Sequence, residues 1–539
     1  MNWLNHLPVL PIAIPLLAGA LILLFQEQRR AIRIGIALVS TLLQLALAFA
    51  MLVLTTDAAP HFWSEGIGTY AIGGWPAPFG IVLVVDRLSA LMLALNGVLA
   101  LAVVVHSIAR WDREGVYYHP LLQFLLLGLN GAFLTGDLFN LFVFFEILLA
   151  ASYALLLHGG GAQRTKAALH FVIVNLVGAF AFLIGVAMLY SVLGTLNMAD
   201  IAVRWGALAD ADRTVAATGA AILGVAFLIK AGSWPLNFWL PGAYAAASAP
   251  VAAAFAIATK VGVYAVLRLW SVMQTPAASF GEGWLFLLAL ATMLFGTLGI
   301  LAARQLSRLI AFTVVLSSGT LLAAAGLGTP TMIAPALFYL VGSVMASGAF
   351  FMLAGMTERM RTTPTATSDP LQPWPTYNAF SVGEPPAPDA EVGIAIPAAM
   401  AFLGINFICC VLLVTGLPPL PGFIAKMALV AAAIDAPASV GVSPWRAWTL
   451  VIVLLLGGLV GLIALARAGM RLFWSVTDRN TPRLRVVEAA PLAFLILASL
   501  ALSAAAGPAM AYFQDTAADL NSPDAYVRAV LGTQTQVNP

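Results

Sequence analysis

Long apolar segments alternate with short polar ones along the whole chain. Each apolar segment approaches the roughly 20 residues that an α-helix needs to cross a bilayer. These segments cover residues 7–25, 31–55, 84–109, 118–136, 137–158, 167–193, 214–240, 249–272, 283–303, 307–328, 332–356, 393–434, 447–470 and 489–513. The pattern predicts an all-α polytopic membrane protein with about 14 transmembrane helices. The longest polar stretch, about 357–392, is predicted to be a loop between two of them.

The composition supports this class of protein. Hydrophobic residues make up 61% of the 539 residues and charged residues only 9%, with a mean hydropathy of +0.97. Soluble domains carry about 25% charged residues, so we expect this chain to lie in a lipid bilayer. The net charge of +2 is too small to indicate a nucleic-acid partner.

Basic residues predict how the spans are oriented. Cytoplasmic loops of membrane proteins are enriched in Lys and Arg. If both termini are external, 16 basic residues fall on the cytoplasmic side: Arg29, Arg30, Arg33, Arg110, Arg113, Arg164, Lys166, Arg304, Arg308, Arg359, Arg361, Arg467, Arg471, Arg479, Arg483 and Arg485. Five fall outside: Arg204, Arg213, Arg268, Arg446 and Arg528. This asymmetry predicts that both termini face outward, into the periplasm or external space.

Two of the predicted spans are interrupted by glycine and proline. The sequence KAGSWPLNFWLP begins at Lys230, and its Pro235 should break the span 214–240, because proline removes a backbone donor and clashes with the preceding turn. A denser break, TGLPPLPGFIAK, precedes Lys426 within 393–434. The prolines of this second break are Pro418, Pro419 and Pro421. Each break therefore has a lysine beside it.

The two broken spans are five spans apart, which predicts an internal repeat. An odd number of spans in each unit makes the two units inverted, and paired broken helices in inverted repeats indicate an ion path near the membrane midplane. We therefore divide the chain into helices one to three (1–117), a first repeat (118–272), a second, inverted repeat (283–470), and a last helix with an external C-terminal tail (471–539).

Four ionisable groups lie within or beside apolar spans. Glu146 stands in FVFFEILLAASY and Lys260 near the middle of 249–272, in addition to Lys230 and Lys426. A charge at mid-membrane costs roughly 2.5–3.5 kcal/mol, so such residues usually have a function. Loss of water favours a neutral lysine and a nearby carboxylate favours a charged one, which is the coupling that a proton relay needs.

Structural roles are the alternatives for these and neighbouring residues. Glu146 could only neutralise a lysine, and Lys426, near the outer side, could extend its ammonium toward the surface. His170, near the start of 167–193, is expected to be packed or to face the lumen more readily than to join a relay. Asp86 and Arg87 are adjacent, so they are expected to serve different partners.

Other chemistries have no support in the sequence. The segment GGGAQRTK at 159–166 resembles a nucleotide-binding loop only superficially, because it lies between two membrane helices with no preceding strand. No His or Cys pair has the spacing of a haem, zinc or iron–sulfur site. No metal site, cofactor or catalytic residue of an enzyme is therefore expected, and an ion gradient is the only visible energy source.

Several motifs resemble those of a known family. They are TGDLFNLFVFFEILLAASYALLLHG, LGTLNMADIA at 193–202, LIKAGSWPLNFWLPGAYAAASAPVAAAFAIATKVGVYAVLR and TGLPPLPGFIAK. Together they resemble the antiporter-like subunits shared by respiratory complex I and Mrp-type multisubunit cation/proton antiporters. Among these, the run LGTLNMADIA favours the D subunits of the Mrp (also Mnh, Pha or Sha) type. The resemblance covers about residues 5–510.

The resemblance implies roles for individual residues. Glu146, Lys230, Lys260 and Lys426 match the family's essential charged positions, and Asp137 matches an acidic residue at the start of the same helix as Glu146. In YLVGSVMASGAFFMLAG, the positions at which many members carry lysine or histidine hold Ser343 and Ser347. The stretch QLSRLIAFTVVLSSG likewise lacks a histidine found in some relatives. Either the relay passes through serines and water here, or the second half of the chain conducts differently.

The implied function is transport within a larger hetero-oligomer. The chain would move protons, or exchange protons for Na⁺ or K⁺, together with other antiporter subunits. The first alternative is a proton-pumping membrane subunit of a complex I-like or hydrogenase-like redox complex. The second is a scaffold that only holds other subunits. The sequence leaves open the choice of Na⁺ or K⁺ and the stoichiometry.

Overall fold

The computed structural model describes residues 3–56, 62–273, 282–358, 398–440, 442–473 and 484–532. Most of the loop predicted at 357–392 lies outside these ranges. The helices are α1 (Leu10–Leu23), α2 (Arg30–Leu54), α3 (Arg87–Ser107), α4 (Tyr118–Leu134), α5 (Leu138–Leu157), α6 (Ala162–Leu193), α7 (Met198–Gly206), α8 (Asp210–Ala231), α9 (Trp239–Ala246), α10 (Ala249–Met273), α11 (Glu282–Ala302), α12 (Leu306–Gly326), α13 (Pro330–Glu358), α14 (Ala398–Thr415), α15 (Pro421–Val440), α16 (Pro444–Phe473), α17 (Val486–Ala504), α18 (Ala506–Asn521) and α19 (Asp524–Leu531).

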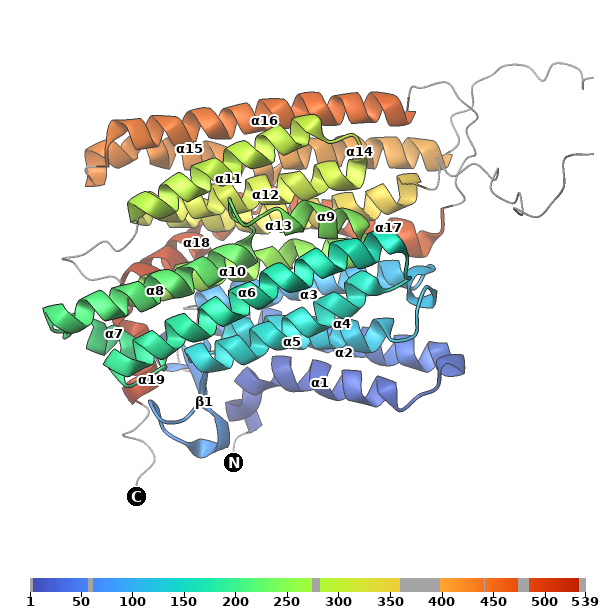
Figure 1. Cartoon of the computed structure of the whole chain (residues 1–539). Helices are drawn as coiled ribbons and strands as arrows, with labels where there is room; N and C mark the ends of the chain where they lie inside the picture. The colour runs from blue at the N-terminus through green and yellow to red at the C-terminus, as the bar shows by residue number, and fades with distance from the viewer. Residues whose placement is uncertain are drawn as a thin grey trace, which may run out of the picture.

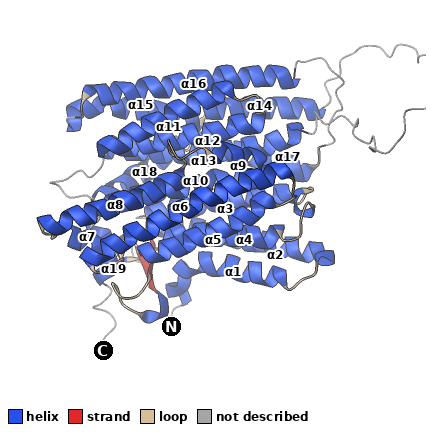
Figure 2. Cartoon of the chain, viewed as in Figure 1, coloured by secondary structure: helices blue, strands red, loops and turns tan. Residues whose placement is uncertain are grey.

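The long helices lie side by side in one bundle (Figure 1). Figure 2 shows that helix makes up nearly all of the described chain. Two short strands, β1 (Gly68–Ala71) and β2 (Val82–Val85), form an antiparallel hairpin at the end of the bundle where α1 begins and α19 lies. A helix satisfies its backbone hydrogen bonds internally, which is why apolar segments in lipid adopt this form.

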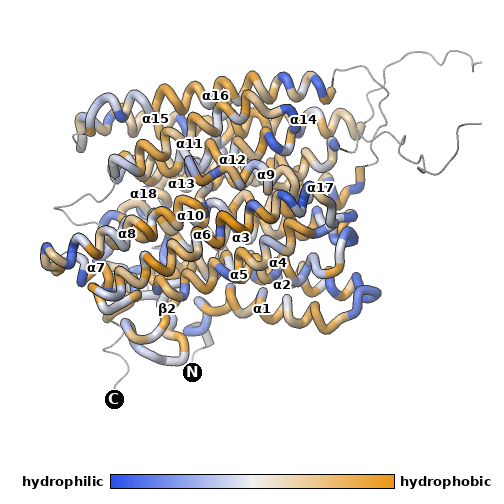
Figure 3. The backbone as a smooth tube through the Cα atoms, viewed as in Figure 1, coloured by the Kyte–Doolittle hydropathy of each residue, from blue (hydrophilic) through white to orange (hydrophobic). Residues whose placement is uncertain are grey.

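The predicted membrane-spanning architecture is confirmed. Within the described residues, 14 helices are long and apolar enough to cross a membrane. That set counts α14 and α15 separately and leaves out the 17-residue α4, which packs between α1 and α5. Figure 1 shows α14 and α15 end to end alongside the 30-residue α16, so they form one interrupted span. Hydropathy falls toward the helix ends, as Figure 3 shows.

Both predicted breaks are present, and the spans that they interrupt run in opposite directions. Pro235 lies between α8 and α9, while Pro418 and Pro419 lie between α14 and α15. Pro421 is the first residue of α15, where its missing N–H leaves no hydrogen bond unmade. In Figure 1, α8 starts at the end of the bundle that holds α19, whereas α14 starts at the opposite end. The two interrupted spans are therefore antiparallel.

Three helices form the centre of the bundle. In the most apolar windows of α10, α12 and α13, 89%, 89% and 94% of the residues are buried, against 44% for α16. α10 packs against both α12 and α13. A charged residue on α10 is therefore surrounded by protein and not by lipid.

Candidate functional site

Glu146 on α5 and Lys230 on α8 are close enough to interact electrostatically. The Lys230 side chain is buried, with 8% of the residue exposed, and its Nζ lies 5.4 Å from the centre of the Phe145 ring. Glu146 interacts with it electrostatically. Among the described residues, Glu146 Oε1 and Lys230 Nζ have no hydrogen-bond partner. Buried polar atoms without partners are rare in folded proteins, so this pair is a candidate site of proton exchange.

Contacts from α11 stabilise the backbone at the first break. Lys230 lies in the last turn of α8, which ends at Gly232 with φ of 70°. Glycine adopts this left-handed conformation without steric strain. Beyond it, the Trp234 N–H donates to Thr292 Oγ1 at 2.9 Å, and the Ser233 hydroxyl lies 3.0 Å from the same oxygen. Thr292 thus supplies the partners that an unwound segment needs at this depth.

Lys260 lies next to this break, on α10. Only 1% of the residue is exposed, and its Nζ donates to Ser318 Oγ on α12 at 3.1 Å. Gly262 allows α10 to approach the end of α8, because a Cβ at this position would lie 2.4 Å from the Ala231 nitrogen. The missing side chain therefore brings the turn that carries Lys230 into backbone contact with the turn that carries Lys260.

Buried hydroxyl groups extend the set of polar residues formed by Glu146, Lys230 and Lys260 into the second half of the chain. We call the extended set the polar line. The Ser317 hydroxyl, beside Ser318 on α12, donates to Ser343 Oγ on α13 at 3.0 Å. Tyr339 interacts with Ser317 from one turn earlier on α13. Ser347 is also buried, with 5% exposed. Serines thus occupy this part of the interface between α12 and α13.

Lys426 occupies the second break. Its Nζ donates to the carbonyl oxygen of Thr415, the last residue of α14, at 2.7 Å, and 9% of the residue is exposed. A Cβ at Gly416 would lie 2.7 Å from Lys426 Cδ, and one at Gly458 would lie 3.4 Å from Nζ. The ammonium is therefore enclosed by backbone and does not extend to the surface. The negative end of α14 favours its positive charge.

Two accessory candidates lie apart from this line. Asp137 caps α5, since its Oδ1 accepts from the Asn140 N–H at 2.9 Å. Burial raises the pKa of Asp137, although hydrogen bonds from the backbone of Asn140 and Phe139 oppose this. The expectation that His170 is packed or faces the lumen is wrong: it is exposed on α6, with its Nδ1 2.8 Å from the Lys166 carbonyl oxygen. The structure brings neither residue into the central group.

Sequence reasoning missed several members of this line. Ser317 and Ser318 stand in LSSG, a stretch noted only for its missing histidine. Thr292 gave no sequence signal, because a threonine in an apolar helix usually bonds its own backbone, as Thr292 also does at 2.7 Å to the Leu288 carbonyl. The expectation for Asp86 and Arg87 is confirmed: Asp86 pairs with Arg268, and Arg87 pairs with Asp519.

A water-accessible cavity of about 570 Å³ opens at the end of the bundle away from α19. It lies where α9 ends and α10 begins, so it approaches the helix that carries Lys260. Its lining includes Glu114, Arg164, Ser248, Gln305 and Glu358. The Ser248 hydroxyl is buried and has no hydrogen-bond partner among the described residues. Water and ions can therefore reach the base of α10 from this side.

Comparisons with known proteins identify the family. Residues 135–373 match the family described as NADH:quinone oxidoreductase/Mrp antiporter, TM. The chain is 49% identical to the D subunit of a probable K⁺/H⁺ antiporter of Rhizobium meliloti, over 98% of both chains. It is 32% identical to the D subunit of the Na⁺/H⁺ antiporter of Alkalihalophilus pseudofirmus, over 98% of this chain and all of the relative.

A solved structure shows the same fold. A chain of the Mrp complex from Dietzia sp. superposes with a TM-score of 0.82 at 26% identity, covering 99% of this chain and 100% of the other. Sequence and structure thus agree over nearly the full length, and the chain belongs to the family of D subunits of Mrp-type multisubunit cation/proton antiporters.

Proposed function

We propose that this chain carries protons through the membrane within a multisubunit monovalent cation/proton antiporter, and that Glu146, Lys230, Lys260 and Lys426 hold the proton in turn. One observation carries the proposal: Lys230, Lys260 and Lys426 are buried and Glu146 is half-buried within apolar helices, and Lys260 and Lys426 donate to a hydroxyl and a carbonyl oxygen. Buried charges of this kind are retained in membranes for proton transfer.

The first transfer is set by the distance between Glu146 and Lys230. The Glu146 carboxylate interacts electrostatically with Lys230, but Glu146 Oε1 and Lys230 Nζ form no direct hydrogen bond. A carboxylate nearby favours the charged lysine, and burial favours the neutral one. Small movements of α5 against α8 therefore change which group holds the proton.

The second half of the path uses hydroxyls. A serine hydroxyl both donates and accepts hydrogen bonds, so Ser318 can accept a proton from Lys260 and pass its own to a water that bridges toward Ser317. Ser317 and Ser343 extend the path toward α13. Gly342, next to Ser343, lies against Pro421 at the second break, where a Cβ would be 3.7 Å from the proline Cβ. These contacts support a route through serines and water over a second half that conducts differently.

The cation that we favour is K⁺, because the relative with 49% identity is named for K⁺/H⁺ exchange. The assembled complex in inverted vesicles should show proton efflux on addition of K⁺, with Na⁺ less effective. The chain alone should show no exchange. Robust exchange by the purified single chain in liposomes would refute the dependence on partner subunits, and equal or better exchange with Na⁺ would refute the choice of K⁺.

A redox-driven proton pump is the other candidate, since the matched family description also names NADH:quinone oxidoreductase. A pump subunit would transport protons only when its complex oxidises a reduced substrate. Cation-driven exchange in vesicles without an electron donor excludes this alternative.

We further propose that the chain lies in a bacterial inner membrane with external termini, and that 118–272 and 283–470 are the inverted repeats. The antiparallel broken spans support the repeats, and the distribution of basic residues supports the orientation. In a background with Cys409 and Cys410 replaced by alanine, Ser522→Cys should react with an impermeant external reagent. Gln163→Cys, at the other end of the bundle, should react only after permeabilisation, and its labelling in intact cells would overturn the orientation.

A further inference from the structure

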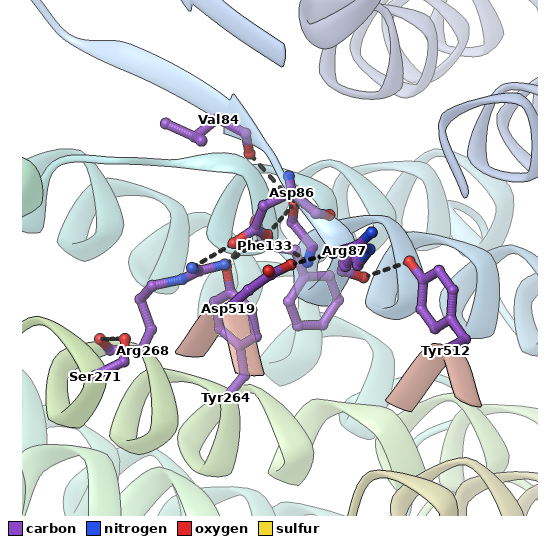
Figure 4. Close-up of polar contacts among 10 residues, drawn as sticks. Val84, Asp86, Arg87, Phe133, Tyr264, Arg268, Ser271, Tyr512 and Asp519 are labelled. Atoms are coloured by element: carbon purple, nitrogen blue, oxygen red, sulfur yellow. Dashed lines mark hydrogen bonds and ion pairs between the residues drawn. The ribbon is translucent and has the colours of Figure 1, made fainter. Parts of the chain in front are cut away.

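A buried ion pair lies at the end of the bundle that holds the β-hairpin. Arg268 on α10 donates to both carboxylate oxygens of Asp86, at 2.6 and 2.8 Å, and the two residues are 5% and 7% exposed (Figure 4). Burial raises the pKa of the Asp86 carboxyl, but the charge and hydrogen bonds of Arg268 outweigh it and lower the pKa overall. Asp86 is therefore ionised, and the pair is a two-pronged contact of fixed geometry.

Arg268 shares a face of α10 with Lys260. Lys260, Tyr264 and Arg268 follow one another at intervals of four residues, so their side chains leave the helix on the same side. The Tyr264 hydroxyl donates to the Phe133 carbonyl oxygen at 2.7 Å and lies 3.3 Å from Arg268 Nη2. One stripe of α10 thus carries the relay lysine and two contacts that fix the rotation of the helix.

Asp86, the partner of Arg268, is fixed by hydrogen bonds at the start of α3. Asp86 caps α3 through a reciprocal pair of hydrogen bonds with Ser89, at 2.8 and 2.9 Å. The next residue, Arg87, pairs with Asp519 of α18 at 2.9 Å, and the Tyr512 hydroxyl donates to the Arg87 carbonyl oxygen at 2.8 Å. These contacts join the start of α3 to α18, as Figure 4 shows.

We propose that Asp86 and Arg268 are positioning residues for proton transfer: their ion pair fixes α10 against the anchored start of α3 and so holds Lys260 at Ser318. The inference rests on the proposed role of Lys260 in the proton path. Arg268 is about 12 Å from Lys260 along the helix axis, and a helix transmits a rotation or shift over that distance with little loss. A displacement of about 1 Å at a reacting group can slow transfer a hundredfold.

The decisive variant replaces both charges, as Asp86→Asn with Arg268→Gln. Replacing either residue alone leaves a buried charge unpaired, which is expected to impair assembly. The double variant has no such charge, so it should assemble in wild-type amounts. Its exchange rate at saturating cation should nevertheless fall by about tenfold to a hundredfold, and the pH of half-maximal exchange should shift because Lys260 has lost its fixed partner.

Two further variants keep the test decisive. Arg528→Gln removes an exposed ion pair with Glu65 on the same end of the protein, at 3.1 Å, and should change neither assembly nor exchange. Arg268→Lys keeps every charge but cannot make the two-pronged contact with Asp86, so it should assemble and show the same pH shift as the double variant.

Wild-type exchange and pH profile in the double variant would overturn the inference and leave the pair a purely structural contact. If the double variant does not assemble, a wild-type pH profile in assembled Arg268→Lys overturns the inference in the same way. Lys260→Ala is measured alongside. Normal exchange in that variant would instead overturn the proposed function. Failure of the inference and failure of the proposed function can therefore be distinguished.

Discussion

Glu146→Gln and Lys230→Ala are each expected to abolish cation-dependent proton exchange while the complex still assembles. Without the Glu146 charge, Lys230 is a buried amine with nothing to favour its protonated form, so it stays neutral and transfer stops. Without Lys230, the carboxylate has no group to pass its proton to. Exchange is measured as dequenching of a pH-sensitive dye in vesicles, and assembly by co-purification of the partner subunits.

Matched variants separate a relay from a structural charge. Glu146→Asp keeps the carboxylate and should retain part of the exchange. Asp137→Asn changes an acid to an amide on the same helix but keeps a capping oxygen, so it should behave as wild type. If Glu146 only balanced a lysine, the double replacement Glu146→Gln with Lys230→Ala would restore transport. Near-wild-type exchange in assembled Glu146→Gln would exclude the relay.

Ser318→Val is expected to slow exchange strongly, whereas Ser318→Thr is not. Valine and threonine have nearly the same shape, but only threonine keeps the hydroxyl that accepts from Lys260 Nζ at 3.1 Å. Loss of the only described partner of a buried group costs about 1–3 kcal/mol, or roughly fivefold to a hundredfold in rate. The same pair of replacements at Ser317 tests the contact with Ser343.

The contrast between valine and threonine is the informative quantity in this experiment. Wild-type rates for both variants at both positions, with normal assembly, would show that the hydroxyls do not carry the proton. Equal loss in both would indicate that packing on α12 is disturbed, since both side chains are larger than serine.

The spans and their breaks were predictable because lipid imposes a simple rule on sequence. Apolar length predicts a helix, and glycine and proline predict where it stops, as at Pro235 and Pro418. The exact ends were less accurate: the span expected at 84–109 starts with a strand, β2, before α3 begins at Arg87. Strand and helix are hard to separate in a short apolar run such as IVLVV.

The charged members of the site were also predictable, because a charge in an apolar span stands out. Their contacts were not. Ser318 and Lys260 are separated by 58 residues and Arg268 and Asp86 by 182, and helical periodicity does not report which faces meet at such separations. α6 is apolar around much of its surface, so its residue pattern does not indicate that His170 faces outward.

The interruption between α14 and α15 has a consequence for biogenesis. The apolar window of α15 has a mean hydropathy of 1.3, against 2.3 for α14 and 2.8 for α16. A segment that carries Lys426 gains little from entering lipid by itself, whereas its two neighbours gain a great deal. We infer that α15 enters the membrane together with α14 and α16, so that Lys426 passes from the aqueous channel of the insertion machinery to the Thr415 carbonyl without facing lipid.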